Sequence, residues 1–128
     1  MLNGKLRAKV LVVDDEETIG IGMSEILKDV GFEAAYVVDG RQAVEEVKDK
    51  PYGLVFMDIV MPGMNGLDTF REIKKIRPEI KVILFTGYFR DAEGVILQGI
   101  KEGMIDEFIR KPYFADEIVK SAKKYLQA

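Results

Sequence analysis

The chain has 128 residues, of which 48% are hydrophobic and 32% are charged, as expected for one compact folded domain. It contains neither cysteine nor histidine, which excludes disulfides, thiolate or imidazole metal ligands, and Ser-His or Cys-His catalysis. Any bound metal is therefore expected to be a hard cation held by oxygen atoms. The formal net charge of -3 argues against direct nucleic-acid binding, and no apolar run approaches the ~18 residues of a membrane span. We therefore expect a cytoplasmic protein without membrane contact.

Apolar periodicity along the chain alternates between that of strands and that of helices. Five short apolar stretches have the length and composition of strands: Lys9–Val13, Glu33–Val38, Leu54–Asp58, Lys81–Thr86 and Asp106–Ile109. Each is followed by a segment with apolar residues at helical spacing: about 17–30, 41–49, 67–76, 91–102 and a last one striped by Ile118, Val119, Ala122, Tyr125 and Leu126. Asp39 is predicted to cap the second helix, and the two glycines of 91–102 weaken the fourth helix.

Five strand–helix units in succession predict one doubly wound α/β domain over residues 1–128, with helices on both faces of a parallel five-stranded sheet. Acidic residues decide the strand order. Asp14 and Asp15 follow the first strand and Asp58 ends the third, so a shared site needs these strands side by side. They are neighbours, about 4.8 Å apart, in the flavodoxin-like order 2-1-3-4-5 but about 9.6 Å apart in the order 3-2-1-4-5. We predict 2-1-3-4-5.

Asp58 ends an apolar run that is predicted to be buried on both faces, and ligands of such folds bind just outside the carboxyl ends of the strands. A solvated strand end explains this one residue equally well. Together with Asp14 and Asp15, however, it forms a set of carboxylates that repel by about 3 kcal/mol per pair at ~5 Å and an effective dielectric near 20. Mg²⁺ is the expected compensation. With a lysine at Lys111 and a hydroxyl at Thr86, the site is equipped to attack phosphorus and form an aspartyl phosphate.

Four motifs, each at the end of a predicted strand, resemble those of the bacterial two-component response-regulator receiver domain, chemotaxis regulators included: Val12-Val13-Asp14-Asp15-Glu16, Met57-Asp58-Ile59-Val60-Met61-Pro62-Gly63, Leu84-Phe85-Thr86-Gly87 and Phe108-Ile109-Arg110-Lys111-Pro112. The resemblance covers nearly the whole chain. It implies a signalling module that catalyses its own phosphorylation and dephosphorylation without being an enzyme in the ordinary sense. The implied partners are a sensor histidine kinase or phosphotransfer protein as donor in trans, and a downstream effector protein or C-terminal effector domain. The resemblance is also compatible with a homodimer.

The resemblance further implies roles for individual residues of the metal site. Asp58 would be the phosphoacceptor, and Asp15 would be a direct Mg²⁺ ligand. Asp14 would act on the metal largely through water, and the main-chain carbonyl of Val60 would be a further ligand. Glu16 and Glu17 are interpreted only as acidic residues favoured in the first turn of a helix.

Three more residues carry roles implied by the resemblance. Lys111 would grip the phosphoryl group. Thr86 would follow the new phosphoryl oxygens and draw its loop inward, which vacates space for the ring of Phe108 to turn. Each residue also has a purely structural interpretation: Thr86 as a strand end, Lys111 as a solvated base, and Phe108 as core packing.

Other function classes fit the residues less well. A haloacid-dehalogenase-like phosphohydrolase needs a second acid two residues after the nucleophile, where this chain has Val60. A flavodoxin-like FMN site needs amides and hydroxyls after the first strand, where the acidic run from Asp14 to Glu17 would repel phosphate. A receiver-like interaction module that works without phosphorylation remains the alternative, and the complete set of acidic, hydroxyl and lysine residues argues against it.

Overall fold

The computed structural model describes residues 9–58, 66–86, 97–103, 106–110 and 115–126. Its strands are β1 (Lys9–Val13), β2 (Glu33–Val37), β3 (Leu54–Asp58), β4 (Lys81–Thr86) and β5 (Glu107–Arg110). Neighbouring strands are parallel, and their order is β2-β1-β3-β4-β5. The predicted α/β class with a parallel sheet is confirmed, and the order of the described strands is the one that the acidic residues predicted.

The helices are α1 (Glu17–Asp29), α2 (Gly40–Asp49), α3 (Gly66–Ile76) and α5 (Ala115–Tyr125). Residues 97–101 are also helical, whereas the earlier part of the predicted 91–102 helix lies outside the described residues. Helix α1 ends one residue earlier than predicted, at Asp29. Val30 has already left the helical region (φ -105, ψ 13), and Gly31 follows with a φ of 102, which a residue with a Cβ rarely adopts.

The predicted fifth strand, Asp106–Ile109, is wrong by one residue at each end, since β5 begins at Glu107 and ends at Arg110. Asp106 contacts β4 differently from a strand residue. Its N–H donates to the carbonyl of Val82 (2.9 Å), and its side-chain Oδ2 accepts from the N–H of the same residue (2.8 Å). This side-chain bond takes the place of a ladder bond, so regular pairing starts only at the next residue.

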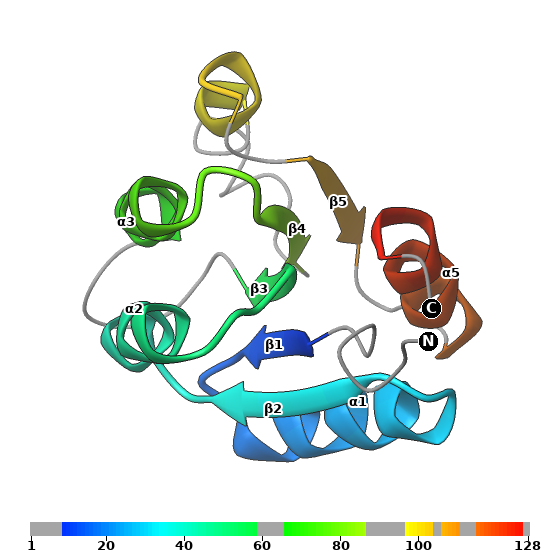
Figure 1. The fold of residues 1–128 in the computed structure, drawn as a ribbon. Helices are drawn as coiled ribbons and strands as arrows, with labels where there is room; N and C mark the ends of the chain where they lie inside the picture. Colours follow the sequence, from blue (N-terminus) through cyan, green and yellow to red (C-terminus); the bar gives the residue numbers. More distant parts are fainter. Residues whose placement is uncertain (1–8, 59–65, 87–96, 104–105, 111–114, 127–128) are drawn as a thin grey trace, which may run out of the picture.

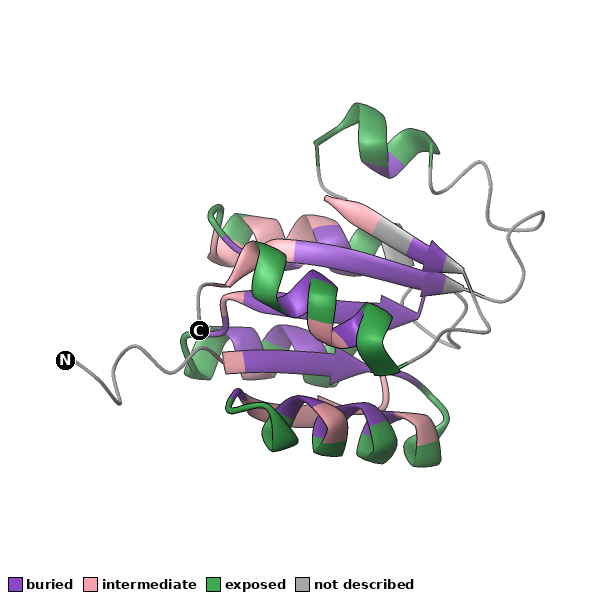
Figure 2. Ribbon diagram, turned by 90° about the vertical axis from the view of Figure 1, so that its right-hand side faces the viewer, coloured by how far each residue is buried: buried purple, intermediate pink, exposed green. Residues whose placement is uncertain are grey.

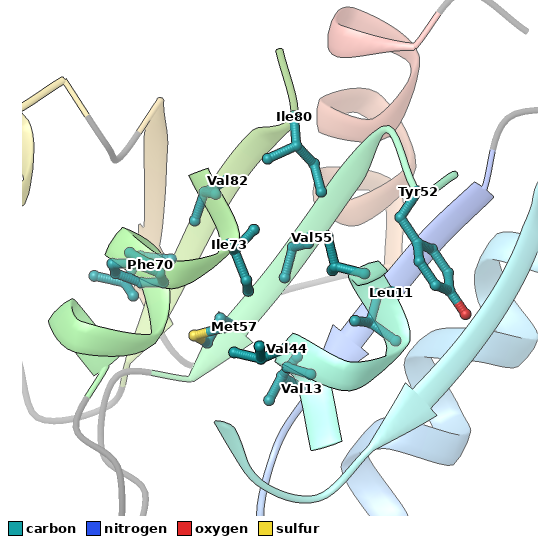
Figure 3. Packing of buried hydrophobic residues seen from close by; sticks show 13 residues of the cluster. Leu11, Val13, Val44, Tyr52, Val55, Met57, Phe70, Ile73, Ile80 and Val82 are labelled. Atoms are coloured by element: carbon teal, nitrogen blue, oxygen red, sulfur yellow. The ribbon is translucent and has the colours of Figure 1, made fainter. Parts of the chain in front are cut away.

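Helices cover both faces of the sheet, with α2 and α3 on one face and α1 and α5 on the other (Figure 1). Strand β3 is buried along its whole length, as predicted, and its side chains alternate between two apolar clusters. Val55 and Met57 belong to the cluster under α2 and α3, part of which Figure 3 shows, whereas Leu54 and Phe56 belong to the cluster under α1 and α5. Figure 2 shows the consequence, buried strands between helices whose outward faces are exposed.

Local signals at the ends of elements also hold. The side chain of Asp39 accepts a hydrogen bond from the N–H of Gln42 (2.8 Å), which confirms the predicted cap of α2. Gln42 in turn accepts the N–H of Val38 on its side-chain oxygen (3.1 Å). The cap therefore fixes the chain where β2 passes into α2. Within the described part of the chain, no helix has the length and apolar character needed to cross a membrane.

Candidate acidic site at the carboxyl edge of the sheet

Strand pairing brings the predicted acidic residues together. Val13 at the end of β1 pairs with Met57 of β3, so Asp14 and Asp15 follow β1 beside Asp58, the last residue of β3. One carboxylate oxygen of each of these three residues lies within 4.8 Å of the others. The predicted strand order depended on a shared acidic site, and the structure has that order and brings the three carboxylates together.

The three carboxylates differ in exposure. Asp14 is fully buried and Asp58 is 6% exposed, whereas Asp15 is exposed to solvent. Main-chain bonds hold Asp14: its N–H donates to the carbonyl of Val37 on β2 (3.2 Å), and its side-chain Oδ1 accepts from the N–H of Glu16 (2.8 Å). The site therefore has a fixed, buried floor and one acidic group at its rim.

The hydrogen bond from Glu16 to Asp14 was not predicted. Such an Asx-type bond, from an aspartate side chain to the main-chain N–H two residues later, could have been predicted from the position of Asp14 just before the start of a helix. Glu16 itself is the N-cap residue of α1 and makes no side-chain capping bond, and Glu17 lies in the first turn, so the structural interpretation of both residues is consistent with the fold.

The chemistry of this donor set favours a hard divalent cation. Three carboxylates with oxygen atoms within 4.8 Å of one another repel by about 3 kcal/mol per pair at ~5 Å and an effective dielectric near 20, and two of them are buried from solvent that would screen this repulsion. They offer oxygen ligands only, which is the preference of Mg²⁺ and Ca²⁺. The residues present thus fit such an ion.

The remaining predicted site residues are placed less completely. Thr86 is the last residue of β4, and the residue before it, Phe85, pairs with Asp58. Phe108 lies in β5 opposite Leu84 of β4. The side chains of Thr86 and Phe108 lie outside the described part of the structure, as do Val60 and Lys111 altogether. The carboxyl ends of β1, β3 and β4 therefore share one edge, and the side-chain roles of these four residues stay predictions.

A contact that the sequence did not predict joins α3 to Glu102, the residue that follows the helical segment 97–101. The guanidinium of Arg71 donates two hydrogen bonds to the carboxylate of Glu102, from Nε (3.0 Å) and Nη2 (2.8 Å), and a third to Asp68 (3.0 Å). Arg71, assisted by Gln98, lowers the pKa of Glu102 to about 2. Arg71 and Glu102 are 31 residues apart in the sequence, so no local sequence pattern predicts this pair.

A comparison with known protein families decides the identity of the fold. The model of the response regulator receiver domain matches residues 10–123. This chain belongs to that family. The matched residues include the buried residues of both core clusters and all three aspartates of the acidic site.

Individual relatives agree with this assignment. The chemotaxis protein CheY of Thermotoga maritima is 37% identical over 117 residues, which are 91% of this chain and 95% of the relative. Sporulation initiation phosphotransferase F of Bacillus subtilis is 34% identical over 122 residues, 94% of this receiver domain and 95% of the relative. Among solved structures, the response regulator TrrA of Thermotoga maritima, in complex with Mg²⁺-BeF, matches with a TM-score of 0.78 and 33% identity, covering 93% of this chain and 99% of that one.

Proposed function

We propose that this receiver domain accepts a phosphoryl group on Asp58 and thereby switches its affinity for a downstream partner. One observation carries the proposal: Asp58 ends a fully buried strand, and two further carboxylates lie within 4.8 Å of it at the same sheet edge. A buried acidic cluster of this kind costs stability, so a chemical role explains why the fold retains it.

The proposed donor is a phosphohistidine of a sensor kinase or phosphotransfer protein. A carboxylate oxygen of Asp58 attacks the phosphorus atom, a new O–P bond forms, and the P–N bond to the donor imidazole breaks with its electron pair left on the nitrogen. Hydrolysis later restores the carboxylate and releases inorganic phosphate. The sequence contains no histidine, so the donor group is not within these 128 residues.

Asp14, Asp15 and Asp58, with the main-chain carbonyl of Val60, would hold Mg²⁺. Bound there, the ion would supply positive charge for the transferring phosphoryl oxygens. Asp14 is held by two main-chain hydrogen bonds, so it presents its carboxylate without a cost of ordering, while the exposed Asp15 completes the set from the solvent side. The TrrA relative was solved with Mg²⁺-BeF, which supports an Mg²⁺ site here.

Lys111, Thr86 and Phe108 complete the proposal. The Lys111 ammonium would bind a phosphoryl oxygen, and the Thr86 hydroxyl would donate to another, since Thr86 ends the strand next to Asp58. Movement of Thr86 would then leave space for Phe108 of β5 to turn inward. The output would be a changed surface for an effector, which is either a separate protein or a linked domain. Both kinds of relative occur: the match covers 95% of the CheY relative but only 50% of RegX3 of Mycolicibacterium smegmatis, whose other half lies outside the match.

Intact mass spectrometry tests the acceptor. Incubation with acetyl phosphate and Mg²⁺ is expected to add one phosphoryl group to wild type and to Asp49→Asn, and none to Asp58→Asn. Asp49 is an exposed aspartate at the end of α2 and serves as the matched control. An adduct that persists in Asp58→Asn would show that the acceptor is another residue. A wild type that gains no mass would favour the phosphorylation-independent interaction module.

A further inference from the structure

Strand β2 has an open edge. Among the described residues it pairs with β1 alone, and it is only partly buried along its length; Figure 1 shows it at the margin of the sheet with α1 beside it. The carbonyl of Val37 accepts the N–H of Asp14, so the main chain of Val37 faces β1. Because main-chain groups point alternately to the two sides of a strand, the N–H and C=O groups of Ala34 and Tyr36 face outward.

Both ends of this edge are closed by hydrogen bonds. Before the strand, the N–H of Phe32 donates to the carbonyl of Leu27 (3.1 Å), and after it the N–H of Val38 donates to the side chain of Gln42 (3.1 Å). The outward main-chain groups of β2 are therefore those of residues 34 and 36, which are symmetric about Ala35. An edge with this symmetry can pair with a copy of itself in antiparallel fashion.

Helix α1 presents a second symmetric pattern on the same side. Four residues at spacings of four, three and four form one stripe of the helix, named here the α1 stripe: Glu17, Ile21, Ser24 and Lys28. A groove of about 270 Å³ between this helix and β2 is lined by three of its members together with Ala34, Ala35 and Tyr36. The stripe carries opposite charges at its two exposed ends and an isoleucine, 43% exposed, near its centre, whereas Ser24 is buried and donates to the carbonyl of Gly20 (2.8 Å).

The centres of the two patterns lie at the same level. A Cβ on Gly20 would lie 3.0 Å from the ring of Tyr36, and Ile21, Ser24 and Lys28 line one groove together with Ala34 and Ala35. The middle of the α1 stripe, between Ile21 and Ser24, is therefore next to the middle of β2. One two-fold axis can serve the strand and the helix together.

We propose that two copies of this chain associate through β2 and the α1 stripe about a two-fold axis at Ala35, which joins their sheets into one. Ala34 of each copy would exchange N–H···O=C bonds with Tyr36 of the other. The small Ala34 side chain would lie under the partner's tyrosine ring on the α1 face. Along the helices, Glu17 of each copy, which accepts a hydrogen bond from the hydroxyl of its own Tyr36 (3.0 Å), would face Lys28 of the other, which pairs with its own Glu25 (3.6 Å).

Charge and composition favour a second copy as the occupant. The same two-fold sets each charged end of the α1 stripe against the opposite charge, and sets Glu33 beside Val37, so no like charges meet in the strand. Residues 33–37 contain one charged residue, Glu33, which pairs with Lys9 of β1, and no lysine, proline or positive φ, which are the other devices with which proteins commonly block an edge strand. This inference does not depend on phosphorylation of Asp58.

Sedimentation velocity of the whole chain from about 1 μM to about 1 mM tests the association. We expect a dimer whose Kd rises at least tenfold in Glu17→Lys and in Lys28→Glu, and returns toward the wild-type value in the double variant. Lys48→Glu is the matched control, since Lys48 and Lys28 each pair with a glutamate three residues earlier at 3.6 Å. A chain that stays monomeric over this whole concentration range would overturn the proposal. The same conclusion would hold if the β2 edge bound an added peptide strand but not a second copy of the chain.

Amide exchange and a proline variant locate the interface. The N–H groups of Ala34 and Tyr36 should exchange quickly in dilute solution and be protected at high concentration. Ala34→Pro should abolish the dimer, because it removes one outward N–H and leaves the bonds to β1 in place; circular dichroism checks its fold. A dimer that tolerates the charge swaps and leaves these amides unprotected would use another surface, and the proposal would be wrong even if Ala34→Pro failed to fold.

Discussion

Single residues at the ends of strands carry most of the functional information in this chain. Asp14, Asp15 and Asp58 could be predicted as a cluster because each follows an apolar run whose burial leaves no ordinary reason for a charge there. The hydrogen bond that orients Asp14 could not be predicted with the same ease, since it depends on the main-chain geometry of residues 14–16. Sequence thus identified which residues meet, and the structure adds which of them is buried and held.

Removal of Asp15 is expected to weaken Mg²⁺ binding about tenfold or more, or about 1.4 kcal/mol, because the site loses its solvent-side carboxylate. Isothermal titration of Asp15→Ala measures this, with Glu16→Ala as the control, since the side chain of Glu16 makes no capping bond. In chelator, the same Asp15→Ala variant should unfold at higher urea than wild type because a repulsion is gone. Equal Mg²⁺ affinities of Asp15→Ala and wild type would contradict the assignment.

At the scale of elements, local patterns predicted the strands and helices well because each is encoded by residues within one segment. The third and fourth strands match their predicted bounds, and the cap of α2 matches its predicted residue. One error was local, since α1 ends at Asp29 before the positive φ of Gly31, and another arose where a long-range contact sets the boundary. Asp106 is the example, because its side chain bonds to β4 and delays the start of β5.

The cap of α2 should contribute measurably to stability. Asp39→Ala removes the acceptor for the N–H of Gln42 and is expected to lower the free energy of unfolding by about 1 kcal/mol. Asp39→Ser, which keeps a side-chain oxygen as acceptor, should retain most of the stabilisation that the cap provides. Urea unfolding of the three proteins gives these values. A loss in Asp39→Ser as large as that in Asp39→Ala would show that capping is not the cause.

The Arg71–Glu102 pair predicts a pH dependence. Arg71 and Gln98 lower the pKa of folded Glu102 to about 2 from its ordinary value of 4.5. Between these two pH values the unfolded chain therefore binds more protons at this residue than the folded chain does. The stability advantage of wild type over Glu102→Gln should be complete above pH 4.5 and be lost as the pH falls through about 2. Urea unfolding of both proteins from about pH 6 to about pH 3 tests this; a constant difference would contradict it.

For the molecule as a whole, the fold follows from a parallel sheet buried on both faces. Strand β3 alternates its side chains between the two clusters, so it must lie inside the sheet, and its acidic end must meet the end of β1. The sequence predicted this arrangement because chemistry required the two acidic ends to be neighbours. It did not predict the pairing of α3 with segment 97–101, nor the symmetric edge of β2, because both depend on how separate elements lie in space.

Chemical identification of the phosphorylated atom tests the central claim most directly. After incubation with acetyl phosphate and Mg²⁺, reduction with borohydride converts an aspartyl phosphate into homoserine, which peptide mass spectrometry can locate. The proposed function predicts homoserine at position 58 and unmodified aspartate at positions 14 and 15. Homoserine at 14 or 15, or its absence from a chain whose mass shows a phosphoryl group, would contradict it.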